Sequence, residues 1–130
     1  MNSLNLSVKE IMAFVPSGKN YRMAIDFYKD LGFEVDWDSE ELAIIRKGTS
    51  RFYLQNFANE EMQKNFMMNI EVENLNDWWQ KIESSRIKEK YEGVRVIPPK
   101  VYPWGKREIH LIAPDGVLWH IATRISEERA

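Results

Sequence analysis

Hydrophobic and polar residues recur along the chain with two periods, and these periods predict the same order of elements twice. Alternation typical of strands and the spacing typical of amphipathic helices give a β-α-β-β-β pattern in each half. In the first half we expect a strand at 10–15, a helix at about 20–31, and strands at 33–37, 42–46 and 51–57. In the second half we expect a strand at 66–72, a helix with the apolar face Leu75, Trp78, Trp79 and Ile82, and strands at 94–97, 106–112 and 117–123.

Turn-forming residues bound these elements. Pro16-Ser17-Gly18 is expected to end the first strand, and Pro98-Pro99 the strand at 94–97. Gly32 is expected to end the first helix, because glycine adopts the left-handed conformation at little cost. A polar connector at 58–65 separates the halves. We therefore predict an α+β fold in one domain of residues 1–130, in which two βαβββ modules (about 10–57 and 66–125) form a curved mixed sheet around a cleft.

Composition narrows the classes of function. The chain has 18 basic and 20 acidic residues and a net charge of −2, so no nucleic-acid partner is expected. It has no cysteine, which excludes disulfides, thiolate nucleophiles and Cys-ligated zinc. The N-terminus has no apolar signal segment and no apolar run is long enough to span a bilayer, so we expect a cytoplasmic protein without a membrane partner. No nucleophile elbow or glycine-rich phosphate loop is visible, and no catalytic residue is predicted.

Two segments resemble a known family. One is AIDFYKDLGF at residues 24–33, and the other is PWGKRE at residues 103–108, which runs into Pro114-Asp115-Gly116. They are similar to motifs of the vicinal oxygen chelate superfamily (glyoxalases, bleomycin resistance proteins and extradiol dioxygenases), especially of its bleomycin-resistance-like branch. Ala113 departs from the aspartate that usually precedes Pro-Asp-Gly. The superfamily contains metal-dependent enzymes as well as metal-free drug-binding proteins, so the resemblance implies the fold more firmly than the function.

The resemblance also implies where a metal would be bound in the enzymes, with one ligand from each of four strands. On this chain the four positions fall at or near Glu10, near Tyr53, at Met67 (or Asn69 if the register slips) and at His120. A methionine thioether is too soft for hard divalent ions, and tyrosine is a poor ligand unless ionised. We therefore expect no metal and no other cofactor, with Glu10 and His120 as the remaining candidates for a divalent ion.

The two histidines of the chain flank one turn. His110 and His120 are equally far from Asp115 along the sequence, so they are expected to face each other across the last hairpin. Both side chains can be hydrogen-bonded packing residues, or they can contact a ligand.

Alternation along the strands also assigns a ligand-facing side. Tyr53, Gln55 and Phe57 share one face, whereas Phe52 and Leu54 share an apolar face expected to meet the helix. Trp104 either stacks on a planar ligand at the rim or pins its own loop. The predicted ligand-binding residues are Trp37, Tyr53, Gln55, Phe57, Met67, Asn69, Glu71, Trp104, His110 and His120.

The function implied by the resemblance is small-molecule binding. We expect a homodimer that sequesters an aromatic or cationic ligand, such as a bleomycin-like molecule, in a cleft between subunits, without chemistry. Aromatic stacking would hold the ligand, and Glu71 and Glu10 would supply negative charge. The alternatives are a divalent-metal-dependent lyase or dioxygenase of the same superfamily, and a protein whose Tyr53 face is only a subunit interface.

Overall fold

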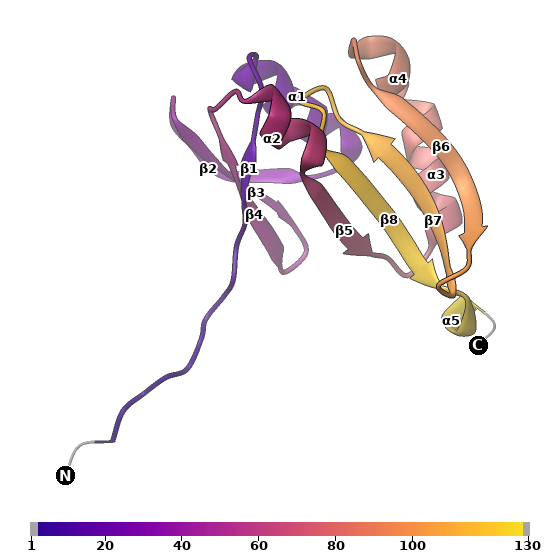
Figure 1. The fold of residues 1–130 in the computed structure, drawn as a ribbon, viewed down its shortest axis with the longest axis horizontal. Helices are drawn as coiled ribbons and strands as arrows, with labels where there is room; N and C mark the ends of the chain where they lie inside the picture. The colour runs from indigo at the N-terminus through magenta and orange to yellow at the C-terminus, as the bar shows by residue number, and fades with distance from the viewer. Residues whose placement is uncertain (1–2, 129–130) are drawn as a thin grey trace.

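The computed structural model describes residues 3–128, which form two βαβββ modules (Figure 1). The first module contains β1 (Phe14–Pro16), α1 (Tyr21–Leu31), β2 (Glu34–Asp38), β3 (Leu42–Lys47) and β4 (Ser50–Gln55). After α2 (Glu60–Asn65), the second contains β5 (Met67–Glu71), α3 (Leu75–Ser85), α4 (Ile87–Lys90), β6 (Arg95–Tyr102), β7 (Lys106–Ile112) and β8 (Leu118–Arg124), followed by α5 (Ile125–Glu128). Among these residues, no helix is both long and apolar enough to cross a membrane.

Each module builds one four-stranded mixed sheet, and the two sheets repeat one topology. Their strand orders are β1-β4-β3-β2 and β5-β8-β7-β6, with the outer pairs β1–β4 and β5–β8 parallel and all other pairs antiparallel. Figure 1 shows the sheets side by side, with α3 behind β6 and β7 and the N-terminal segment extending away from both. The predicted α+β fold of two βαβββ modules is therefore confirmed.

The predicted strand ends were wrong at two prolines. β1 includes Pro16 and starts only at Phe14, and β6 runs through Pro98 and Pro99 to Tyr102. Both strands lie at the edge of their sheets, where a residue without an N–H is tolerated because one side of the strand has no partner. In β6 the pairing register shifts between Ile97 and Lys100, so a bulge absorbs the two prolines.

Three short helices were not predicted. The structure forms α2 within the expected connector, α4 between α3 and β6, and α5 after the last strand. The α2 helix begins at Asn59, whose side chain accepts a hydrogen bond from the Met62 amide, and it has acidic residues in its first turn. Only Gln63 of this helix is buried, so there is no apolar stripe for periodicity to detect.

One core joins the two modules. Helix α1 begins after its N-cap Asn20 and ends at Gly32, which has a φ of 110°. Its Tyr28 makes edge-to-face contacts with Phe52 of β4 and with Trp119 of β8. The Trp119 indole N–H also donates a 3.1 Å hydrogen bond to the Tyr28 hydroxyl. The buried faces of both sheets therefore meet the helices and each other, as alternation predicted for Phe52 and Leu54. The opposite faces of the strands carry the candidate site.

Candidate ligand-binding site

A row of apolar side chains crosses the helix-free face of the first sheet. Phe14, Tyr53, Ile44 and Trp37 are direct neighbours in register across β1, β4, β3 and β2, and we call them the aromatic row. Phe14 is 51% exposed and Trp37 is 50% exposed, although both are large apolar residues. The rings of Phe14 and Tyr53 stack at 4.5 Å between centroids. The structure thus brings the predicted residues Trp37 and Tyr53 onto one surface, and adds Phe14 and Ile44.

The equivalent row on the second sheet is mostly polar. Asn69, His120, His110 and Ile97 are neighbours in register across β5, β8, β7 and β6. The two histidines are directly opposite each other, as predicted, and their ring centroids are 4.5 Å apart. Asn69, a predicted ligand-binding residue, pairs in register with His120.

Glu108 lies at the centre of this polar surface. Its side chain is 2% exposed, and its Oε1 is 2.8 Å from His110 Nε2 and 3.0 Å from His120 Nδ1. Its other oxygen, Oε2, accepts a 2.7 Å hydrogen bond from the indole N–H of Trp104. Burial acts to raise the pKa of Glu108, but the hydrogen bonds from His120, Trp104 and His110 outweigh it and lower the pKa to about 2. Glu108 is therefore a buried carboxylate that stays ionised at neutral pH.

Sequence reasoning did not select Glu108, although two signals pointed to it. Glu108 stands two residues before His110 on β7, so strand alternation places both side chains on the same face. It also closes the PWGKRE motif that supported the family resemblance. Its contact with Trp104 depends on how the β6–β7 loop folds back, which the sequence pattern does not encode.

Tyr102 and Trp104 cover one side of the cluster. The Tyr102 ring stacks on Trp104 at 4.8 Å between centroids and on the His110 ring at 4.7 Å. The Tyr102 hydroxyl is 3.3 Å from His110 Nδ1, which leaves His110 Nε2 as the nitrogen that faces Glu108. A tyrosine hydroxyl both donates and accepts, so it can satisfy either tautomer of this histidine. We refer to Tyr102, Trp104, Glu108, His110 and His120 as the polar cluster.

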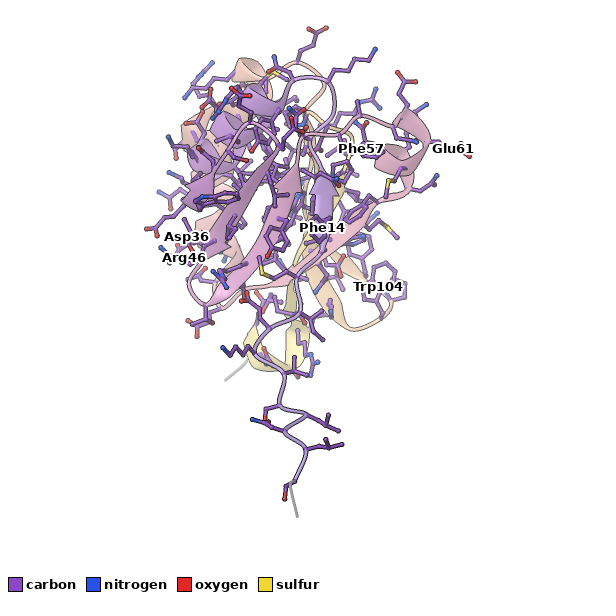
Figure 2. The ribbon with its side chains drawn as sticks, turned by 90° about the vertical axis from the view of Figure 1, so that its left-hand side faces the viewer. Phe14, Asp36, Arg46, Phe57, Glu61 and Trp104 are labelled. Carbon is purple, nitrogen blue, oxygen red and sulfur yellow. The ribbon has the colours of Figure 1, made fainter. Side chains whose placement is uncertain are left out.

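An open hollow of about 420 Å³ borders the polar cluster. The residues that line it come from β5, β7, β8 and the β6–β7 loop: Met67, Met68, Asn69, Trp104, Lys106, Glu108 and His120. Four of these, Met67, Asn69, Trp104 and His120, were predicted from the sequence. Trp104 is 58% exposed, and Figure 2 shows it on the same side of the molecule as Phe57 and opposite Asp36 and Arg46.

The remaining predicted residues lie outside this hollow. Gln55 is the last residue of β4. Phe57 lies two residues beyond it and is partly exposed, and its carbonyl accepts a hydrogen bond from the Gly18 amide. Glu71 is 3.1 Å from Lys106 Nζ and 3.8 Å from Arg124 Nε. Glu71 is thus already paired with basic side chains.

The residues at the superfamily's expected metal positions do not fit a divalent ion. The Glu10 carboxylate accepts hydrogen bonds from the Arg51 guanidinium, and Tyr53 is stacked under Phe14. Met67 offers only a thioether, which is unsuited to hard ions. His120 is an ordinary metal ligand, but its Nδ1 is directed to Glu108. No metal-dependent lyase or dioxygenase step can be derived from these four positions.

Comparison with known protein families identifies the family of this chain. The family model of the glyoxalase/bleomycin resistance protein/dioxygenase superfamily matches residues 13–121. The chain belongs to this superfamily. Comparison with curated protein sequences gives no significant match.

Solved structures of superfamily proteins show a similar fold at low sequence identity. The bleomycin resistance determinant encoded on transposon Tn5 is 19% identical, with a TM-score of 0.77, and the match covers 91% of this chain and 99% of that one. A bleomycin-binding protein complexed with bleomycin is 21% identical, with a TM-score of 0.75 and coverage of 90% and 99%. A bleomycin-binding protein from Streptomyces verticillus complexed with copper(II)-bleomycin is 23% identical, with a TM-score of 0.70 and coverage of 88% and 97%.

Proposed function

We propose that this superfamily member binds a planar aromatic small molecule against Trp104 and sequesters it without chemistry. One observation carries the proposal: more than half of the Trp104 residue is exposed, although its ring is fixed in place. Tyr102 stacks on the indole, and Glu108 accepts its N–H. A tryptophan that served only to pin its loop would be expected to bury its ring, whereas this one presents it beside the hollow.

Fixing the indole beforehand favours binding. Ordering a mobile side chain on binding costs about 0.5–1.5 kcal/mol of conformational entropy. A side chain that is already held in one rotamer avoids most of this cost. Stacking on an aromatic ring contributes about 0.5–1.5 kcal/mol beyond the area that is buried. Met67 and Met68 line the same hollow, and methionine adapts to irregular apolar ligands.

The charge on the site favours a ligand with a cationic group, but not through the residues first expected. Glu71 is paired with Lys106, and Glu10 with Arg51, so both carboxylates are largely neutralised. Glu108 is ionised, and its direct partners are two imidazoles and an indole rather than a lysine or arginine. In our proposal Glu108 supplies the negative potential in the hollow.

The ligands of structurally similar proteins suggest a ligand class for this chain. Two of the similar structures are complexes with bleomycin or copper(II)-bleomycin. We propose a bleomycin-like ligand for this chain, held in a cleft between the two subunits of a homodimer. The exposed aromatic row supports a second subunit, because large contiguous apolar surfaces on small domains commonly mark interfaces.

Tryptophan fluorescence tests the binding. The protein is titrated with metal-free bleomycin in the presence of a chelator, and calorimetry gives the stoichiometry. We expect saturable quenching with the wild type and, because the stacking surface is removed, loss of binding in Trp104→Ala. The matched control is Trp79→Phe, which changes a partly buried tryptophan on α3, away from the hollow.

The outcomes separate the alternatives. Binding that survives Trp104→Ala would contradict the stacking platform, and no quenching at micromolar drug would contradict this ligand class. Sedimentation of the protein with and without the drug tests the homodimer. A protein that dimerises but binds no drug would favour the reading in which the Tyr53 face is an interface only.

A further inference from the structure

We propose that Glu108, His110 and His120 form a binding site for a divalent transition-metal ion such as Zn²⁺. This site differs from the one expected of the superfamily, which takes one residue from each of four strands. It uses only the hairpin of β7 and β8, and it shares His120 alone with the expected set. It is independent of drug binding, because the ion needs no organic ligand to be held.

The three ligand atoms already lie close together. Glu108 Oε1 is 2.8 Å from His110 Nε2 and 3.0 Å from His120 Nδ1, and the ligand atoms of the three residues all lie within 4.8 Å of one another. Zinc bonds of about 2.1 Å at tetrahedral angles place neighbouring ligand atoms about 3.4 Å apart. An ion can therefore replace the two hydrogen bonds with only small movements of the side chains.

The backbone and the neighbouring side chains hold these ligands in place. His110 and His120 are opposite each other in register, and Glu108 is two residues along the same strand as His110. The strands are anchored by Ile109, Leu111 and Ile121, which are buried on the other face. A site built on two paired strands with buried anchors is positioned more accurately than one on loops.

Tyr102 and Trp104 form hydrogen bonds to the metal ligands without being ligands themselves. The Tyr102 hydroxyl can accept a hydrogen bond from His110 Nδ1–H, and in this neutral tautomer Nε2 carries no proton and can coordinate an ion. Trp104 holds Glu108 Oε2 at 2.7 Å, so Oε1 is the oxygen that remains for the ion. Partners of this kind orient metal ligands and tune their affinity.

The chemistry of the set selects the kind of ion. Two imidazoles and one carboxylate suit Zn²⁺, Fe²⁺, Co²⁺ or Ni²⁺ better than Mg²⁺ or Ca²⁺, which prefer oxygen ligands. Three protein ligands leave coordination positions open, and the hollow beside Glu108 and His120 provides room for them. An ion held here would bind a nitrogen or oxygen donor of a small molecule that enters the hollow.

Metal titration tests the site in the absence of any drug. Chelator-treated protein is titrated with Co²⁺, followed by visible absorbance, and Co²⁺ is then displaced with Zn²⁺. We expect one ion per chain. The loss in affinity for His120→Asn should exceed about 100-fold, and Tyr102→Phe, which removes only the outer partner, should weaken binding by about 10-fold. Glu10→Gln is the matched control, because Glu10 is a carboxylate paired with Arg51.

Nuclear magnetic resonance gives a second readout that does not depend on variants that fold poorly. The chain has two histidines, so their imidazole nitrogens can be assigned with a single variant. On addition of Zn²⁺, the nitrogens that face Glu108 should change from protonated to metal-bound. The absence of a saturable one-to-one complex, unchanged imidazole signals, or binding that His120→Asn does not weaken would overturn the proposal. Failure of drug binding in the chelator experiment would leave this result unaffected.

Discussion

Replacing Asp115 with asparagine should change how the stability of the protein depends on pH. Asp115 stands in the turn between β7 and β8 and is only 4% exposed. Its Oδ1 accepts a 2.9 Å hydrogen bond from the Val117 amide, and its Oδ2 is 3.4 Å from the Tyr28 hydroxyl. Burial raises the pKa of this carboxyl from 3.8 to about 7, because the hydrogen bonds from Val117 and Tyr28 offset only part of the loss of solvation.

The sign and size follow from the two pKa values. The folded protein holds the proton up to about pH 7, whereas the unfolded chain releases it near pH 3.8. The stabilising contribution of the protonated form is therefore complete below the unfolded pKa and is lost as the pH rises to the folded pKa. A shift of about three units corresponds to about 4 kcal/mol of unfolding free energy. Asp115→Asn keeps an acceptor for Val117 and cannot ionise, so it removes this dependence.

Urea denaturation from about pH 4 to about pH 8 measures the effect, with unfolding followed by tryptophan fluorescence. We expect the variant to gain stability relative to the wild type as the pH rises, by up to about 4 kcal/mol across the range. The difference between the two proteins cancels the contributions of the other titrating groups. Parallel curves, with a constant difference in free energy, would show that Asp115 ionises with an ordinary pKa in the folded state and would refute the reasoning.

Two further substitutions test the packing that supports the site. Trp119→Phe should lower the free energy of unfolding by about 1–3 kcal/mol, because the buried Tyr28 hydroxyl loses its N–H donor. Urea denaturation measures this loss, with Trp79→Phe as the comparison. An equal loss in both variants would contradict the role of this hydrogen bond. Gly32→Ala should cost about 1–2 kcal/mol, because the residue has a φ of 110°, with no atom closer than 3.6 Å to the added carbon. A neutral effect of Gly32→Ala on the urea midpoint would show that the α1 terminus adjusts its backbone freely.

The order of elements could be read from the sequence because most elements bury one regular face. Phe52 and Leu54 of β4 alternate with residues that the helices do not cover, and Gly32 ends α1 as expected. The errors have two physical origins. Edge strands tolerate prolines that would interrupt a central strand, so β1 includes Pro16 and β6 runs through Pro98 and Pro99 to Tyr102. The α2 helix depends on its cap and charges rather than on an apolar stripe.

Less of the candidate site could be predicted, because it depends on contacts between strands. The pairing of His110 with His120 follows from their equal spacing about one turn, which the sequence contains. Phe14 joins Tyr53 only through the parallel pairing of β1 with β4, whose register no local pattern fixes. The bond from Trp104 to Glu108 requires the β6–β7 loop to fold back over its own strand. Local patterns therefore give the faces of strands, and the tertiary fold decides which side chains meet on them.

The geometry of Glu108 allows the two proposals to hold together. The indole of Trp104 binds Oε2, and the two imidazoles face Oε1, so each oxygen has its own set of partners. An ion coordinated through Oε1 would leave the bond to the indole in place, and the stacking surface would keep its orientation. A planar molecule stacked on Trp104 would then lie in the hollow that also borders the open coordination positions. Such an arrangement favours ligands that combine an aromatic ring with a nitrogen or oxygen donor. The Glu108 carboxylate would then position both the indole that stacks on the ring and the ion that binds the donor.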